Sequence, residues 1–144
     1  AERLISDYCA RAGVTLIHQE GDKAFYRPSN DTIVLPMMSQ FAETAEYYST
    51  AFHEMVHSTG HSNRLNRLTQ TAHFGNEEYS KEELVAEIGA SALVNHAGLE
   101  TEKSFRNSTA YVQSWLNVLK NDKRFIVSAS GKAEKAVELI LAGA

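Results

Sequence analysis

The segment His53-Glu54-Met55-Val56-His57 is an HExxH motif, and its spacing suits metal-dependent hydrolysis. Residues four apart lie one turn apart on the same face of an α-helix, so both imidazoles can bind one metal ion. Glu54 points roughly 100° away around the helix axis and is poorly placed as a ligand. It can instead take a proton from a water at an open position on the metal while that water attacks a carbonyl. We therefore expect His53 and His57 to be metal ligands and Glu54 to be the catalytic base.

The helix that carries this motif is predicted to be largely buried, because apolar and aromatic residues precede it from Tyr47 to Phe52. Buried imidazoles and a buried carboxylate need polar partners. A metal ion satisfies all three side chains. The alternative is a pair of hydrogen-bonded core histidines without a metal.

A catalytic zinc site normally has three protein ligands, so a third must be found. His61 would lie about 12 Å from His53 along a continuous helix, too far to share an ion. Gly60 fits the fuller HExxHxxGxxH pattern, but Asn63 stands where that pattern has its last histidine. The third ligand is therefore expected elsewhere.

Acidic residues downstream offer better candidates for the third ligand. Glu83 and Glu87 lie four apart and share one face of the next predicted helix, so one can bind the metal while the other orients a ligand histidine. We favour Glu83 as the ligand and keep Glu87 as the alternative. Glu83 also completes a capping box that begins at Ser80, a purely structural role. Glu82 is offset by about 100° and is the least suitable of the three.

Zinc is the expected metal, although two imidazoles and one carboxylate also suit manganese, iron or cobalt. A hydrolytic site also needs a donor for the oxyanion that forms during attack. Tyr26, His73 and Tyr79 are candidates for that donor, but none stands at a diagnostic spacing and packing roles explain them equally. The same structural interpretation applies to His18 and His96.

Hydrophobic spacing and turn residues predict the elements that must hold this site. A first helix over residues 2–12 ends at Gly13, and three β-rich runs over 14–19, 24–27 and 32–35 predict an antiparallel meander. The third run ends at Pro36 and is a candidate edge strand for binding an extended peptide. The fold class is therefore predicted to be α+β.

Helices are expected to fill the rest of the chain. The motif helix, capped by Ser39 or Thr44, ends at Gly60, and residues 61–79 form an irregular connection. Ser80 opens a helix that ends at Gly98, and two further helices are lined by apolar residues over 111–119 and 136–141. Ser128 or Ser130 is the expected cap of the last helix.

The chain has 144 residues, of which 43% are hydrophobic, which fits one compact domain over residues 1–144. It has no apolar stretch long enough for a membrane span and no signal-peptide pattern, so the expected compartment is the cytoplasm. Its single cysteine, Cys9, is expected to be buried on the first helix. Because the chain begins with Ala1, we expect it to be a C-terminal piece of a longer protein.

A net charge of −4 argues against binding of nucleic acid through the overall charge of the domain. Basic residues nevertheless gather between 103 and 135. This stretch has few interleaved aromatic residues and lies on predicted helices, so we interpret it as a solvated surface rather than a phosphate-binding one.

An HExxH helix followed by a helix with ExxxE resembles the gluzincin branch of zincin metallopeptidases, in which a glutamate of the second helix completes the zinc site. A larger set of residues around the motif resembles one group of these proteins more closely. Residues 52–61, Arg64-Leu65-Asn66-Arg67 and residues 82–90 are similar to the zincin-like domain at the C-terminal end of ArdC-type antirestriction proteins and related plasmid primases. The likeness extends over the predicted sheet.

This resemblance implies a zinc-dependent metallopeptidase domain, with a protein or peptide substrate, in an antirestriction protein of a mobile element. Such proteins carry an N-terminal domain that binds single-stranded DNA, so DNA binding is expected only through that absent neighbour. The alternative from another functional class is a non-catalytic, metal-stabilised module for protein interaction, in which the same residues serve folding.

Overall fold

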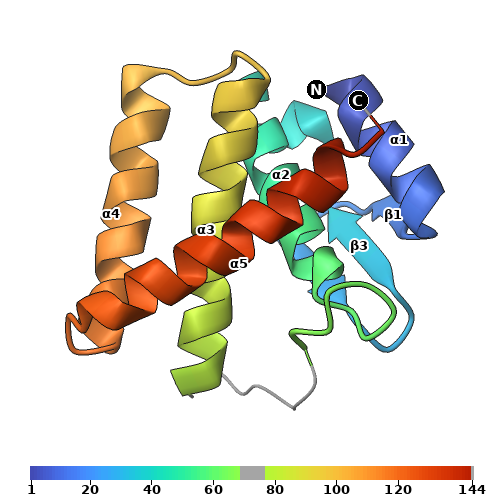
Figure 1. Ribbon diagram of the computed structural model, residues 1–144. Coiled ribbons are helices and arrows are strands. Elements are labelled where there is room, and N and C mark those ends of the chain that lie inside the picture. Colours follow the sequence, from blue (N-terminus) through green and yellow to red (C-terminus); the bar gives the residue numbers. More distant parts are fainter. Residues whose placement is uncertain (69–76, 144) are drawn as a thin grey trace.

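The computed structural model describes residues 1–68 and 77–143. Figure 1 shows its elements, which are five α-helices, three strands and one short 3-10 helix within the described ranges. In chain order they are α1 (Glu2–Ala12), β1 (Thr15–His18), β2 (Phe25–Arg27), β3 (Thr32–Leu35), the 3-10 helix η1 (Met38–Gln40), α2 (Thr44–Thr59), α3 (Glu77–His96), α4 (Glu102–Val118) and α5 (Lys123–Leu141). The predicted α+β class is confirmed, as is the order of one helix, a small sheet and then helices.

The sheet is mixed, so the predicted antiparallel meander is wrong. β3 lies between β1 and β2, parallel to β1 and antiparallel to β2. All four residues of β3 are buried, whereas both neighbouring strands are partly exposed. β3 is therefore the central strand rather than the predicted edge strand at Pro36. Turn residues mark where strands end, but they do not encode on which side of β3 the second strand lies.

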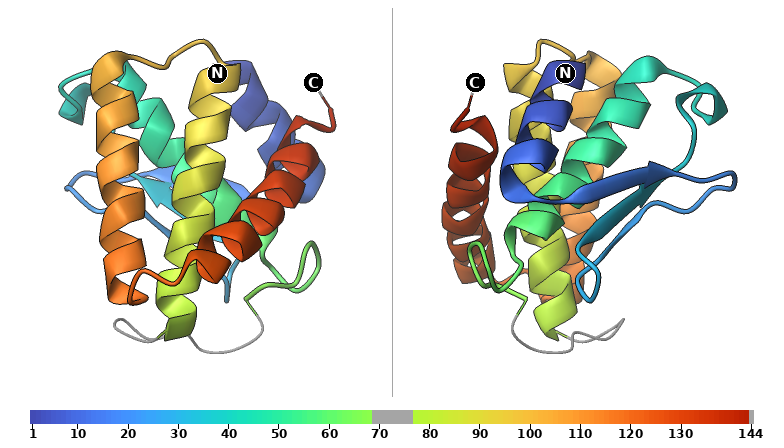
Figure 2. Two further views of the ribbon diagram at one scale, coloured as in Figure 1. Left: turned by 60° about the vertical axis from the view of Figure 1, so that its left-hand side comes forward. Right: turned by 90° about the vertical axis from the view of Figure 1, so that its right-hand side faces the viewer.

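Helix α2 lies at the centre of the domain, with α1 and the sheet on one side and α3 on the other (Figure 2). Its residues Ala51, Phe52, Met55 and Val56 are fully buried. From α1, the Tyr8 hydroxyl lies 2.8 Å from Ser58 Oγ in a buried hydrogen bond. This packing fixes the rotation of α2 about its own axis, and it directs the histidines of α2 toward α3.

Gly89 allows α2 and α3 to approach each other closely. A Cβ atom at this position would lie 2.8 Å from Val56 Cγ2 and 3.1 Å from Val56 Cγ1, closer than carbon atoms pack. The short distance between the helices brings the glutamates of α3 within reach of the histidines of α2. Helix α5 then crosses α3 obliquely on another side (Figure 1).

Several helix ends differ from their predicted places. Helix α3 begins at Glu77 rather than Ser80, and α2 follows Glu43 without a side-chain cap from Ser39 or Thr44. Helix α5 is capped by Asp122, whose carboxylate accepts a hydrogen bond from the Arg124 N–H at 3.0 Å, so the predicted caps at Ser128 and Ser130 are wrong. None of the described helices combines the length and apolar character that crossing a membrane requires.

The single cysteine packs where the first helix meets the core. Cys9 is half-buried rather than fully enclosed, and burial raises the pKa of its thiol to about 11. Such a thiol is protonated at neutral pH, which fits its predicted role as a small apolar side chain.

Candidate metal centre

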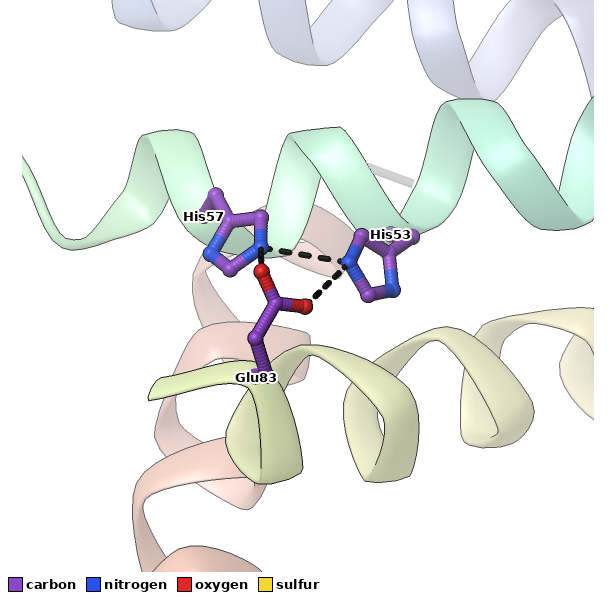
Figure 3. Close-up of side chains that lie close together, drawn as sticks. All are labelled: His53, His57 and Glu83. Carbon is purple, nitrogen blue, oxygen red and sulfur yellow. Dashed lines mark hydrogen bonds and ion pairs between the residues drawn. The ribbon is translucent and has the colours of Figure 1, made fainter. Parts of the chain in front are cut away.

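Helix α2 places two imidazoles side by side, as the motif spacing predicts. The Nε2 atoms of His53 and His57 lie 3.2 Å apart, and the two rings stand nearly perpendicular with centroids 4.8 Å apart (Figure 3). Both nitrogen atoms point toward α3. Two ring nitrogens that converge in this way offer two lone pairs to one shared ion.

Helix α3 supplies a carboxylate at the point where the imidazoles converge. Glu83 Oε2 lies 3.0 Å from His53 Nε2, and Glu83 Oε1 lies 3.3 Å from His57 Nε2 (Figure 3). One donor atom from each of the three residues lies within 4.8 Å of the others. Tetrahedral ligands bonded to zinc at about 2.0–2.1 Å are separated from one another by roughly 3.3 Å. The donor set and its spacing therefore fit a divalent metal ion.

Each imidazole also has a carboxylate on its other nitrogen. Glu87 Oε1 lies 3.0 Å from His53 Nδ1, and Glu82 Oε2 lies 2.8 Å from His57 Nδ1. A metal-binding histidine commonly donates its second N–H to a carboxylate, which fixes the tautomer and the orientation of the ring. Glu87 therefore lies where an orienting residue is needed and Glu83 where a ligand is needed. Helical spacing predicted one orienting glutamate on α3, but it did not predict the second, Glu82.

The carboxylates also change the protonation of the histidines. Burial alone would lower the pKa of His53, but hydrogen bonds to Glu83 and Glu87 outweigh it and raise the pKa to about 9. Burial likewise opposes protonation of His57, yet Glu82 and Glu83 hold its pKa well above the ordinary value. The pKa of Glu83 is lowered, because the two imidazoles overcome the effect of its burial. The centre therefore binds protons tightly when no metal occupies it.

Glu54 lies beside this cluster but outside the set of converging donor atoms. Its residue surface is 7% exposed, and burial raises the pKa of its carboxyl group, partly offset by His57 and His53. It lines a cavity of about 350 Å³ together with His53, Glu83 and Glu87, which we call the metal-site cavity. A carboxylate whose pKa is raised accepts a proton more readily than an ordinary one, and at the wall of a cavity it can exchange that proton with a bound molecule.

Arg67 holds Glu82 in place, a role that the spacing of residues in the sequence does not indicate. Its Nε and Nη2 atoms donate to the two carboxylate oxygens of Glu82 at 2.9 and 3.1 Å. Nη1 donates to Thr59 Oγ1 at 2.9 Å, and Nη2 also donates to the Val56 carbonyl at 2.7 Å. A Cβ atom at Gly60 would lie 3.1 Å from Arg67 Nη2. The only sign of this role in the sequence was that Gly60 and Arg67 both belong to the residues that resemble the zincin-like domain of ArdC-type proteins.

A second buried arginine stabilises the chain that follows the motif helix. Arg64 donates to both carboxylate oxygens of Asp31, and to the carbonyls of Ser58 and Ala12 at 2.8 and 3.1 Å. Tyr26, a candidate oxyanion donor, donates to Asp31 Oδ1 at 2.6 Å and is absent from the described lining of the metal-site cavity. This cluster links the sheet to the end of α2.

The remaining sequence candidates are distributed around the domain. A hydrogen bond connects Tyr79 with Glu83, and the Tyr79 ring lies 5.8 Å from that of Trp115. His61 falls in the turn after Gly60, where its Nδ1 accepts a hydrogen bond from the Asn63 N–H. His18 contacts the Tyr47 hydroxyl at 2.7 Å, and His96 is exposed at the end of α3. His73 lies outside the described residues.

Comparison with known proteins gives a consistent set of relatives. A family model described as a zincin-like metallopeptidase matches residues 3–132. Two Escherichia coli proteins named DNA primase TraC are 45% identical over 134 residues and 42% identical over 132 residues. These alignments cover 92% and 91% of this chain but only 12% and 9% of the relatives.

Two solved structures are similar over nearly the whole chain. The Mn(II)-bound crystal structure of the antirestriction ArdC protein from the R388 plasmid superposes with a TM-score of 0.76 at 37% identity, covering 99% of this chain and 52% of that one. The metal-free structure of that protein superposes with a TM-score of 0.72 at the same identity. This match covers 97% of the present chain and 50% of the ArdC chain. The chain thus spans about half the length of the ArdC chain and about a tenth of the TraC proteins.

Proposed function

Because the chain belongs to the zincin-like metallopeptidase family, we propose that it is a zinc-dependent metallopeptidase domain that hydrolyses peptide bonds. His53, His57 and Glu83 bind the metal, and Glu54 is the catalytic base. The observation that carries this proposal is the convergence of three donor atoms within 4.8 Å, with a carboxylate on the outer nitrogen of each imidazole. The family match and the 37% identical ArdC structures confirm the predicted zincin-like fold.

The chain's own residues account for the proton movements of such a reaction. Glu87 and Glu82 accept hydrogen bonds from the Nδ1 atoms, which leaves both Nε2 lone pairs available. A bound metal would polarise the substrate carbonyl and make a water more acidic. Glu54 takes a proton from the water that attacks the carbonyl carbon, and it delivers that proton to the amide nitrogen as the C–N bond breaks. The raised pKa of Glu54 suits both transfers.

Zinc is the proposed metal, and manganese is its main competitor. Two imidazole nitrogens and one carboxylate oxygen suit either ion, so the donor set does not choose between them. A structure of the ArdC protein is Mn(II)-bound, which keeps manganese a specific alternative for this chain. Elemental analysis of protein purified without added metal would distinguish the two.

The relatives also suggest a setting for this chemistry. One is named an antirestriction protein of a plasmid and others are named DNA primases. We propose that the chain is the peptide-cleaving domain of an antirestriction protein of a mobile element, acting on a protein substrate in the cytoplasm. Its net charge of −4 supports the assignment of any single-stranded DNA binding to another part of such a protein.

The decisive experiment compares the wild-type chain with a Glu54→Gln variant on a broad peptide library. Glutamine keeps the shape of the side chain but cannot take the proton, so cleavage should fall by at least about 100-fold while the metal content stays at one equivalent. Glu46→Gln, a change at a partly exposed position on the same helix that is absent from the described lining of the metal-site cavity, is the control and should cleave normally. Cleavage by Glu54→Gln at the wild-type rate would contradict the mechanism. A fully metal-loaded wild-type chain that cleaves nothing would favour the non-catalytic interaction module.

A further inference from the structure

The metal-site cavity has a second wall that contains none of the proposed ligands. Helix α4 runs alongside α3 (Figure 2), and five of its residues line the cavity opposite His53 and Glu54. They are Ser104, Asn107, Ser108, Tyr111 and Trp115. None of the residues of α4 is fully buried, so its side chains form an accessible surface next to the metal site.

The C-terminal part of this wall is aromatic. Tyr111 is 58% exposed although it is a large side chain on the cavity wall. Trp115 is half-buried and packs edge-on against Tyr79, which is hydrogen-bonded to Glu83. An apolar surface therefore extends from exposed Tyr111 to the immediate neighbourhood of a proposed metal ligand.

When His53 binds a metal as a neutral imidazole, the charged side chains in the described lining of the cavity are all carboxylates. Its described lining includes the carboxylates of Glu54, Glu83 and Glu87, and no Lys or Arg occurs among those lining residues. A bound divalent ion would balance only part of this charge. Groups that carry negative charge would therefore be disfavoured in the cavity beside the metal.

We propose that the α4 wall selects the substrate. It takes a neutral or basic peptide segment that places a bulky apolar side chain against Tyr111 and Trp115, and it disfavours acidic segments. This inference rests on the proposed peptidase function, because it assigns the side-chain preference of the same site. Aromatic and apolar side chains gain affinity from the water-exposed area that they cover on such a wall.

Binding can be measured without hydrolysis in the metal-loaded Glu54→Gln chain. Trp115 is the only tryptophan in the sequence, so its fluorescence reports occupation of the cavity by peptides that lack tryptophan. The probes are capped pentapeptides with a central Phe or Ala between glycines, and a central-Phe peptide flanked by glutamates. The central-Phe peptide should bind about tenfold more tightly than the Ala peptide. Flanking glutamates should weaken binding several-fold.

Variants of α4 then test whether Tyr111 is responsible. Tyr111→Ala should reduce the preference for Phe to less than about threefold, whereas Tyr111→Phe should keep it. Phe105→Ala is the matched control, because Phe105 is 57% exposed on the same helix but lines a different cavity. An unchanged preference in Tyr111→Ala would overturn the proposal. Equal binding of the glutamate-flanked peptide, or no binding of any peptide to fully loaded protein, would also overturn it.

The outcome is separable from that of the peptidase proposal. A wild-type chain that cleaves nothing, while its Glu54→Gln form binds the Phe peptide selectively, would refute hydrolysis and leave the α4 wall as a binding site. A wild-type chain that cleaves Phe and Ala peptides equally well would refute the proposal that the α4 wall selects the substrate, but it would leave the peptidase proposal intact.

Discussion

Arg67 and Glu82 form a bidentate ion pair on the Nδ1 side of the His57 ring. The guanidinium donates to both oxygens of the carboxylate, and one of these oxygens lies 2.8 Å from His57 Nδ1. Arg67 also donates to Val56 and Thr59 of α2, so it connects the orienting glutamate of α3 to the helix that carries the histidines. A planar guanidinium can hold a carboxylate in this fixed geometry, whereas a lysine ammonium cannot.

Arg67→Ala should therefore weaken metal binding without removing a metal ligand. The expected loss of affinity is about 10–100-fold, which is typical for removing outer partners of ligand histidines. Arg67→Lys should fall between the alanine variant and wild type. The measurement is competition with a chelator, with circular dichroism to confirm folding and Arg106→Ala, on the exposed surface of α4, as control. A folded Arg67→Ala chain with wild-type affinity would show that Arg67 does not orient the site.

Gly89→Ala should force apart the two helices that form the metal centre. Its methyl group would meet Val56 Cγ2 at 2.8 Å, and we expect unfolding free energy to fall by about 1–2 kcal/mol in urea titrations. In a Val56→Ala background the obstacle is gone. The same substitution should then be neutral or stabilising, because alanine favours a helix over glycine by about 1 kcal/mol. Equal losses in both backgrounds would contradict the close-packing argument.

Metal affinity should rise with pH, since the metal must displace protons from the histidines. The pKa of His53 is raised to about 9 in the folded chain, and the pKa of His57 is also raised. Protonation of His53 therefore stabilises the metal-free fold fully below the ordinary pKa, and this stabilisation disappears as the pH rises through about 9.

Over the same range, affinity for zinc should increase by about tenfold per pH unit for each displaced proton. Chelator competition between pH 6.5 and 9 measures this dependence, and calorimetry in buffers with different ionisation enthalpies counts the released protons. An affinity that is constant over this range, with no proton release, would contradict the assigned protonation.

The convergence of His53, His57 and a downstream glutamate was predictable because helical spacing is local. The spacing of His53 and His57 suffices to place both on one face of a helix, and Glu83 and Glu87 share a face of the next helix in the same way. Which of the two glutamates meets both imidazoles is seen only once the two helices are packed together. Arg67 was not predictable in this way, because it lies on an irregular segment that no periodicity describes. The roles of Glu82 and Arg67 are recognisable only in the folded structure, where the segment that carries Arg67 packs against α3.

The order of the strands was unpredictable for a related reason. Strand β3 pairs with β1 in parallel and with β2 in antiparallel fashion, and pairing partners depend on contacts between distant parts of the chain. The continuous apolar run Ile33-Val34-Leu35 was the only local sign of a central strand, because an edge strand more often alternates between apolar and polar residues.

Asp31→Asn should destabilise the fold by about 2–3 kcal/mol, because it leaves the Arg64 guanidinium buried without its anion. The Arg64 side chain is only 8% exposed, and Asp31 is its carboxylate partner. Chemical denaturation measures the change. Glu102→Gln, which breaks an exposed ion pair with Arg106, is the control and should cost much less. Equal effects of the two substitutions would show that the buried pair does not stabilise the domain.

The central claim is that His53, His57 and Glu83 share one metal ion, and metal stoichiometry tests it most directly. Elemental analysis after dialysis should find one equivalent of zinc or manganese in the wild-type chain and in His61→Ala, the matched histidine control. His57→Ala should retain less than about a tenth of that amount, because one of its three ligands is lost. Full occupancy in His57→Ala, or a folded wild-type chain that binds no divalent metal, would contradict the account.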